Sequence, residues 1–244
     1  MSLENAAHIE GLLPGWQPAR VPPGVVLEGQ NVLLVPLDVK RYAEALYSVA
    51  TGDGADVGQW DYLAVGPFED QISFTSWLSE CEKTRDPLFF VVTDRQTGAA
   101  QGIVSYLGIA PEHGSIEIGH IWFSAAMQQS SKGTETIYLL AQHAFDDLGY
   151  RRIEWKCDTR NQRSQQAALR FGFTPEGIFR QHRVNKGRNR DTAWFSLIDH
   201  EWPLQRAAFE LWLNGTNFDA NARQIQSLGE IRANLLNGGS DKSV

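Results

Sequence analysis

The stretch that decides the fold runs from Asp158 to Gly177 and reads Asp-Thr-Arg-Asn-Gln-Arg-Ser-Gln-Gln-Ala-Ala-Leu-Arg-Phe-Gly-Phe-Thr-Pro-Glu-Gly. Asn161 is a residue type preferred at the N-cap of a helix, and Gly172 is typical of a helix end. Just before this stretch, residues 152–157 alternate apolar and charged side chains, the period of a half-buried strand. The stretch therefore predicts a strand end, a short Asn-capped helix, a glycine stop and a new strand.

The Asn161-x-x-Ser164 helix, followed by Gly-Phe-x-x-Glu-Gly at residues 172–177, resembles the last conserved motif of the GNAT acetyltransferases. It is most similar to the branch that includes the ribosomal-protein N-terminal acetyltransferases (RimJ/RimL-like). The resemblance implies that both residues line the acetyl-CoA channel, Asn161 at a pantetheine amide and Ser164 near the thioester sulfur. There a hydroxyl can protonate the leaving thiolate. By spacing alone, an ordinary N-cap is the simpler interpretation.

Apolar periodicity predicts the other elements. Strands are expected at 31–37, 88–92, 101–107, 115–123 and 151–157, a closing hairpin at 177–184 and 191–198, and helices after Asp38, around 72–81, at 137–148, at 202–214 and at 219–236. This order is that of the GNAT fold, and the resemblance covers roughly residues 27–200. It implies an α/β fold with a mixed, mainly antiparallel sheet splayed at a bulge, plus C-terminal helices. We expect an arm at 1–26, the GNAT domain at 27–200, a helical extension at 201–237 and a flexible tail at 238–244.

Composition narrows the classes of function. The chain has 244 residues and a net charge of −7, from 22 basic and 29 acidic residues, which argues against nucleic acid as a partner. No apolar run is long enough to span a membrane, and no signal peptide is recognisable, so we expect a cytoplasmic protein. Cys81 and Cys157 are too few for a disulfide framework or a cysteine-based zinc site, and no ligand spacing indicates a metal.

The segment Glu-Ile-Gly-His-Ile-Trp-Phe at 117–123 is similar to a strand of the same family. In that family a bulge here splays two parallel strands, and the pantetheine arm pairs with the exposed edge. The resemblance implies cofactor contacts from the backbone of Ile121, Trp122 and Phe123 and a nearby N–H that polarises the thioester carbonyl. Without the resemblance, an ordinary core strand is the simpler interpretation.

The pyrophosphate loop departs from the family pattern, which places Gly-x-Gly at the start of the long helix. Alignment on the helix puts Gln129 and Ser131 at the two glycine positions, whereas alignment on Gly133 keeps one glycine and shortens the helix. We prefer the helix register. The donors expected to hold the pyrophosphate are the hydroxyls of Ser130, Ser131 and Thr134 and the charge of Lys132, together with the helix N-terminus.

The attacking amine must lose its proton to a base or through water. Glu117 is the first candidate, His120 the second because of its reference pKa, and Glu154 a distant third. The sequence is equally consistent with Glu117 being a strand residue that only faces solvent. Ser164 is the candidate acid, since no tyrosine stands in its helix. Trp60 and Tyr62 either pack on the core, the simpler interpretation, or line a substrate cleft.

The expected function is therefore acetyl transfer from acetyl-CoA to a primary amine, either a protein N-terminus or a small molecule, directly within a ternary complex and without a metal. A non-catalytic acyl-CoA-binding or interaction module is the alternative. Six basic or histidine side chains crowd the closing hairpin: Arg180, His182, Arg183, Lys186, Arg188 and Arg190. They form either a solvated turn or a site that attracts an anionic substrate or the CoA 3′-phosphate; RNA association through them is disfavoured by the net charge. Apolar stripes in the C-terminal helices make a homodimer possible.

Overall fold

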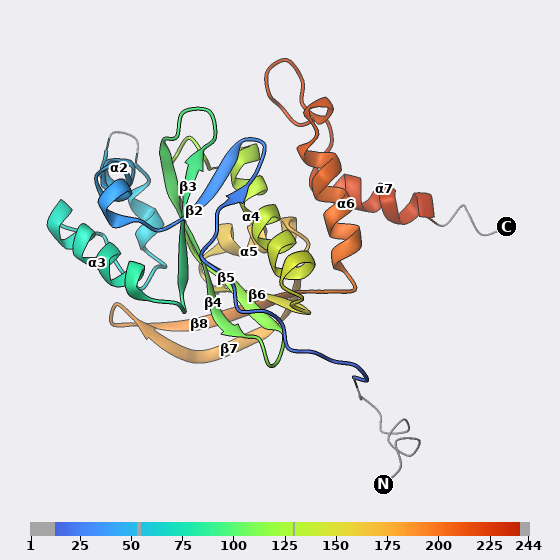
Figure 1. Ribbon diagram of the computed structural model, residues 1–244, viewed down its shortest axis with the longest axis horizontal. Coiled ribbons are helices and arrows are strands. Elements are labelled where there is room, and N and C mark those ends of the chain that lie inside the picture. Colours follow the sequence, from blue (N-terminus) through green and yellow to red (C-terminus); the bar gives the residue numbers. More distant parts are fainter. Residues whose placement is uncertain (1–12, 53–54, 129, 240–244) are drawn as a thin grey trace, which may run out of the picture.

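The structure is a computed structural model that describes residues 13–52, 55–128 and 130–239. Its strands form one eight-stranded sheet in the order β1-β2-β3-β4-β5-β6-β8-β7 (Figure 1). Their bounds are β1 Leu27–Glu28, β2 Val32–Pro36, β3 Leu88–Asp94, β4 Ala100–Ala110, β5 Ser115–Phe123, β6 Arg152–Asp158, β7 Thr174–Asn185 and β8 Arg188–Ile198. Among these strands, β5 and β6 are the parallel neighbours and the other pairs are antiparallel. The expected mixed, mainly antiparallel sheet is confirmed.

Helices cover both faces of the sheet. They are α2 Val39–Thr51, α3 Gln71–Lys83, α4 Ser131–Gln142 with a π-helical continuation η2 His143–Asp147, α5 Gln162–Arg170, α6 Trp202–Leu213 and α7 Leu228–Gly239, with short 3-10 turns η1 Val57–Trp60 and η3 Gly215–Asn217. Figure 1 shows α2 and α3 on one side of the sheet, α4 and α5 on the other, and α6 and α7 beyond α4. The core is correspondingly divided: Leu46 and Phe74 pack against one face, and Leu140 and Phe209 belong to the cluster on the other.

The helix starts predicted from single residues are confirmed. Asp38 accepts a hydrogen bond from the backbone N–H of Arg41 at 3.1 Å, and Asn161 accepts one from Ser164 N at 3.1 Å. Each side chain satisfies one of the N–H groups that a first helical turn leaves without a partner. The chain between β5 and β6 crosses over through α4, as the change of apolar period predicts.

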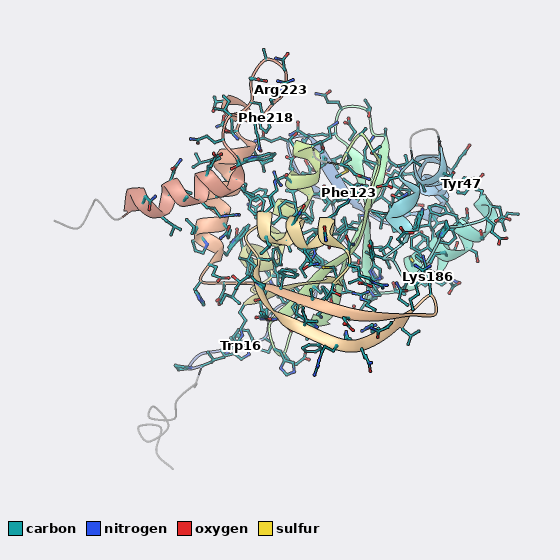
Figure 2. All side chains as sticks on the ribbon, turned by 180° about the vertical axis from the view of Figure 1, so that it is seen from behind. Trp16, Tyr47, Phe123, Lys186, Phe218 and Arg223 are labelled. Atoms are coloured by element: carbon teal, nitrogen blue, oxygen red, sulfur yellow. The ribbon has the colours of Figure 1, made fainter. Side chains whose placement is uncertain are left out.

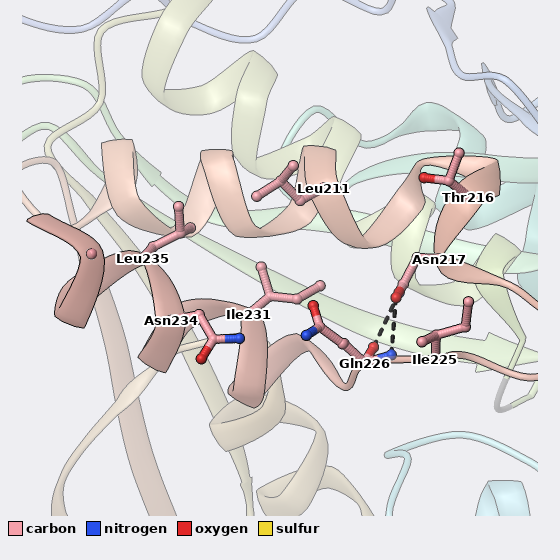
Figure 3. Close-up of a pocket in the computed structure, with 9 residues that line it drawn as sticks. Leu211, Thr216, Asn217, Ile225, Gln226, Ile231, Asn234 and Leu235 are labelled. Atoms are coloured by element: carbon pink, nitrogen blue, oxygen red, sulfur yellow. Dashed lines mark hydrogen bonds between the residues drawn. The ribbon is translucent and has the colours of Figure 1, made fainter.

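The helix expected over 219–236 is wrong at its start, because α7 begins only at Leu228. Asn217 is buried, donates from Nδ2 to Gln226 O at 3.0 Å and accepts from Gln226 N at 2.9 Å (Figure 3). These bonds close residues 218–225 into a loop. Ser227 and Glu230 then cap each other's backbone N–H groups, with Glu230 N donating to Ser227 Oγ at 3.2 Å and Ser227 N donating to Glu230 Oε2 at 2.7 Å.

The part of the predicted arm that the structure describes lies against the sheet domain. Ala19 N donates to Pro111 O at 3.0 Å, and Arg20 N donates to Leu148 O at 2.9 Å. Residues 1–12 of the arm and 240–244 of the predicted tail lie outside the described residues. Within the described part, no helix combines the length and apolar character needed to cross a membrane.

Candidate active site

β5 and β6 run side by side only at their first residues. Their register ends where Glu117 pairs with Glu154, although β5 continues to Phe123 and β6 to Asp158. The two strands therefore diverge toward their carboxyl ends. Among the described residues, the edge of β5 that faces this gap has no strand partner beyond Glu117. An extended ligand can pair with such an edge as an added strand.

A bulge in β5 lies where the divergence begins. Between the pairs Ser105–Gly119 and Ile103–Trp122, β4 advances by two residues and β5 by three. His120, inside the bulge, has a φ of 49°, a left-handed conformation that residues other than glycine rarely adopt. The splayed, bulged sheet implied by the family resemblance is thus present.

Among the residues that the structure describes, the Glu117 carboxylate is held by an ion pair at one of its two oxygens. Lys156 Nζ lies 2.9 Å from Oε2 of Glu117 and 2.6 Å from Oε2 of Glu154. Oε1 of Glu117 lies beside Gly119, 3.6 Å from the position that a Cβ would take there. Burial raises the pKa of Glu117, and the Lys156 charge opposes this rise. Glu117 is therefore not the solvated strand residue of the alternative interpretation, since its side chain is only 12% exposed and its second oxygen lies next to the bulge.

His120 is held by a serine that the sequence does not single out. Its Nδ1 lies 2.9 Å from Ser105 Oγ, and Ser105 also donates to Gly119 O at 3.2 Å. With the one hydroxyl proton donated to Gly119 O, Nδ1 carries a proton and Nε2 bears the lone pair. Burial lowers the pKa of His120, so its imidazole is neutral at pH 7.

The N-terminus of α4 follows directly on the loop after β5. Ser130 is the N-cap residue, but its hydroxyl donates to Met127 O at 2.7 Å and does not cap the helix. The first N–H groups of an α-helix have no acceptor one turn back, and no described side chain caps α4 here, so these groups are suited to bind an anion. Ser131 lies in this first turn, Gly133 faces the Phe123 ring, and Gln129 lies outside the described residues.

Two side chains expected at the pyrophosphate are engaged elsewhere. The Lys132 ammonium pairs with Asp94 at the end of β3 and lowers the pKa of that carboxyl to about 2. Thr134 is buried, and its Oγ1 accepts a hydrogen bond from Arg170 Nη1 at 3.0 Å. Backbone N–H groups and the Ser131 hydroxyl are thus better placed for a phosphate than these two side chains, whereas the Ser130 proton is donated to Met127 O.

α5 follows β6 and begins at the carboxyl ends of β5 and β6, as α4 does. Ser164 Oγ accepts a hydrogen bond from Trp155 Nε1 at 2.9 Å, and Asn161 caps the helix through its carbonyl oxygen. An indole N–H can only donate, so Ser164 keeps its own proton, for which the Cys157 side chain is the neighbouring hydrogen-bond partner. Cys157 lies buried near Ser164, and burial raises the pKa of its thiol, so it is not an activated nucleophile.

The loop between α2 and α3 contacts both the chain just before α5 and the closing hairpin. Tyr62 Oη donates to Arg160 O at 3.1 Å, and Lys186 Nζ donates to Trp60 O at 2.6 Å. Trp60 is only 2% exposed, which confirms core packing for that residue, whereas Tyr62 is half-buried and contacts the chain just before Asn161. Figure 2 shows Lys186 where the hairpin approaches these helices.

A cavity of about 610 Å³ lies elsewhere, between α6, the loop before α7 and α7 itself (Figure 3). None of its lining residues comes from β5, β6, α4 or α5. It is therefore separate from the gap between the strands. The described residues contain no group of three or more His, Cys, Asp and Glu side chains placed to hold a metal ion.

Sequence reasoning missed Lys156, Ser105 and Asp94, which fix the orientation of the candidate residues. The role of Lys156 could have been inferred from the sequence, because it lies on the same strand face as Glu154, whose neighbour on β5 is Glu117. The roles of Ser105 and Asp94 could not have been inferred in this way, since their contacts join segments that are distant in the sequence.

Comparison with known proteins places this geometry in a family. Residues 31–174 match the model of an acetyltransferase (GNAT) domain. A GCN5-related N-acetyltransferase from Brucella melitensis is similar in structure, with a TM-score of 0.88 and 41% identity over 91% of this chain and 100% of that one. A probable GNAT acetyltransferase from Chromobacterium violaceum ATCC 12472 gives a TM-score of 0.74 and 43% identity over 79% of this chain and 95% of that one.

Among curated proteins, the putative ribosomal N-acetyltransferase YdaF of Bacillus subtilis (strain 168) is 23% identical over 171 residues, 70% of this chain and 91% of that protein. This similarity agrees with the RimJ/RimL-like branch implied by the Asn161 motif. With the splayed sheet, the bulged strand and a family domain that spans most of the chain between β2 and the start of β7, the chain belongs to the GNAT family of acetyltransferases.

Proposed function

We propose that this acetyltransferase moves an acetyl group from acetyl-CoA to a primary amine by direct transfer in a ternary complex. The observation that carries the proposal is the unpaired edge of β5 between Gly119 and Phe123. Because β5 and β6 are parallel, their carboxyl ends lie at the same end of the sheet, and α4 and α5 both begin at that end. Acetyl-CoA has an extended arm to pair with the strand and a pyrophosphate to sit at the N-terminus of α4.

The donor would be held mainly by backbone groups. The pantetheine arm pairs with Ile121, Trp122 and Phe123, and the pyrophosphate contacts the loop 129–134. Asn161 uses its carbonyl oxygen as the helix cap, so its Nδ2 is left to donate to a pantetheine amide. The bulge at His120 provides the backbone N–H that polarises the thioester carbonyl.

The chemistry then needs one base and one acid. Glu117 Oε1 takes a proton from the ammonium, directly or through water, and the neutral amine attacks the carbonyl carbon. The C–S bond breaks, and the Ser164 hydroxyl, polarised by Trp155, donates its proton to the departing thiolate. The hydroxyl regains a proton from the nitrogen through water. His120 is the second candidate base. Buried, unactivated Cys157 supports transfer without a covalent intermediate.

The acceptor is a protein N-terminus or a small primary amine. Similarity to a relative named as a putative ribosomal N-acetyltransferase favours the protein N-terminus. The alternative, a non-catalytic acyl-CoA-binding module, is favoured by one observation: the Lys132 ammonium is paired with Asp94 and Thr134 is buried, which leaves fewer side-chain donors for a pyrophosphate.

An acceptor screen followed by free-thiol release tests the proposal, with peptides and small amines supplied in parallel. Acceptor-dependent thiol release is expected, together with a calorimetric signal for acetyl-CoA. Binding of acetyl-CoA without release on any acceptor would favour the non-catalytic module. An absence of binding would contradict both readings.

A further inference from the structure

The closing hairpin contains two arginines that face each other across its strands. Arg183 on β7 is directly opposite Arg190 on β8. Like charges in this position destabilise a sheet. Among the described residues, neither arginine forms an ion pair with a carboxylate, and Arg190 donates from Nε to Thr192 Oγ1 at 3.2 Å. Arg190 attracts the Glu117 and Asp158 carboxylates only at longer range, so no direct ion pair among the described residues offsets the repulsion.

This pair lies on the face of the sheet that carries the candidate base. Arg190, Thr192 and Trp194 alternate along β8 and so share one face. Trp194 is paired with Lys156, whose Nζ lies 4.1 Å from the Trp194 ring centroid and also holds Glu117. The hairpin thus forms a continuous surface from the two arginines to the site of proton transfer.

The acidic groups near this surface already have partners. Glu117 is paired with Lys156, and Asp158, opposite Thr192, is bound by Arg160 at 2.6 Å. Each carboxylate is thus held directly by another cation and attracts Arg190 only at longer range, which leaves the two guanidinium groups for an anion from outside.

Aromatic and histidine side chains complete the surface. The Phe179 ring lies 4.6 Å from Trp194, and His182 Nδ1 lies 3.0 Å from Thr192 Oγ1. Burial, Arg183, Arg190 and Lys156 lower the pKa of His182, which reflects the positive potential of the surface. Phe179 is 52% exposed, so an extended chain can lie against it.

Building on the proposed function, we propose that Arg183 and Arg190 bind a carboxylate of the acceptor, and that the preferred acceptor is an acidic peptide. Trp194 and Arg190 are four residues apart on β8, about 13 Å of strand. The arginine side chain reaches part of the way back toward Trp194. The acceptor's amine, placed beside Trp194, and its carboxylate, placed at the arginines, are therefore separated by on the order of two or three residues of extended peptide. An acidic side chain at the second or third residue of a peptide meets this spacing, whereas the carboxylate of a free amino acid is too close to its amine.

Two matched peptides test the proposal: one begins Ser-Glu-Glu and the other Ser-Gln-Gln, with the same later residues. For the unaltered enzyme, kcat/KM is expected to favour the Glu peptide by about tenfold, the effect of one charge-assisted contact. Arg183→Gln and Arg190→Gln should each remove most of this preference by raising KM for the Glu peptide, with kcat unchanged. Arg223→Gln makes the same charge change in the loop before α7, far from the hairpin (Figure 2), and should preserve the preference.

Equal use of both peptides by the unaltered enzyme would overturn the proposal while leaving acetyl transfer intact. A weaker calorimetric affinity for acetyl-CoA in the hairpin variants, with peptide preference unchanged, would show that the arginines bind the donor instead. The proposed function fails only if no acceptor, small amines included, releases thiol from acetyl-CoA. Calorimetric binding of the two peptides to the enzyme–CoA complex still decides the present inference, which requires the Glu peptide to bind more tightly.

Discussion

At the scale of single residues, Lys156 determines how Glu117 can act. One ammonium lies between the carboxylates of Glu117 and Glu154, so protonation of Glu117 at Oε1 still leaves Lys156 paired with Glu154. A buried charge without a partner would be costly. Glu117 can therefore accept a proton without leaving an isolated cation, which suits a base that is protonated in every turnover.

Glu117→Gln is expected to lower kcat by about a hundredfold, the lower end for loss of a general base, and to leave acetyl-CoA affinity unchanged. A base works deprotonated, so kcat/KM should fall as pH drops through its pKa. Burial raises the pKa of Glu117 and lowers that of His120, so the two values approach each other and the unaltered profile does not identify the base. Loss of the acid limb in Glu117→Gln but not in His120→Gln identifies Glu117. The opposite pattern assigns the role to His120.

Ser164→Ala should reduce kcat by about tenfold or more with little change in acetyl-CoA affinity, because a leaving-group acid acts in the transition state. Steady-state kinetics and calorimetry measure the two effects separately. Trp155→Phe removes the indole donor to Ser164 and should give a smaller loss of turnover in the same direction. Turnover within twofold of the unaltered enzyme in Ser164→Ala would mean that water protonates the thiolate.

Lys132→Ala is expected to weaken CoA binding by about 1 kcal/mol, because it leaves the Asp94 charge without its partner, where it repels the phosphates proposed to bind at the nearby start of α4. Asp94→Asn is the matched control, since it frees the Lys132 ammonium and should leave CoA affinity equal or higher. Calorimetry with CoA gives both values. Unchanged affinity in both variants would show that the pair only braces the turn after β3.

At the scale of elements, the N-terminus of α5 combines a structural and a proposed binding role in one side chain. Asn161 Oδ1 caps the helix, whereas Nδ2 is the part of the amide left for a ligand. The two roles can be separated because aspartate caps a helix as well as asparagine does but has no N–H to donate.

Asn161→Asp should therefore keep the thermal stability of the protein and weaken acetyl-CoA binding by about 1 kcal/mol, the loss of one hydrogen bond. Asn161→Ala should weaken binding and also reduce stability by about 1 kcal/mol through the lost cap. Thermal unfolding and calorimetry on both variants distinguish the effects. If Asn161→Asp binds acetyl-CoA with unchanged affinity, Asn161 is only a helix cap.

At the scale of the whole molecule, α6 is part of the main core. Trp202 stacks on Phe145 with ring centroids 5.3 Å apart, and Phe209 lies 6.1 Å from Phe171. These contacts join α6 to the ends of α4 and α5, which cover the same face of the sheet. α7 packs on α6 through Leu228 and Ile231.

Truncation after His200 should sharply reduce solubility and thermal stability, because burial of each large aromatic of α6 stabilises the fold by roughly 2–3 kcal/mol. Truncation after Gln226, which removes only α7, should cost less. Thermal unfolding and light scattering measure both, and the mass of the full chain by light scattering tests the predicted self-association. A soluble chain ending at His200 with full stability and unchanged mass would contradict this account of the extension.

The sequence alone determined the order of the elements and the helix caps at Asp38 and Asn161. Caps and apolar periods depend on residues within a few positions of each other, so the local chain specifies them. The Ser227–Glu230 capping box was readable in the same way, but a continuous apolar pattern concealed it. The family resemblance around Asn161 and Glu117 rested on the same short motifs.

Tertiary structure alone decided which candidate side chains are oriented for chemistry and which are engaged. Ser105 meets His120 across two strands, Asp94 meets Lys132 across 38 positions, and the Asn217 side chain replaces the predicted first turns of the last helix with a loop. Such contacts arise when packing brings distant segments together and buries polar groups that must then find partners. A pattern of neighbouring residues carries no record of which partner is found, because that choice depends on distances fixed only once the sheet has splayed and the helices have packed.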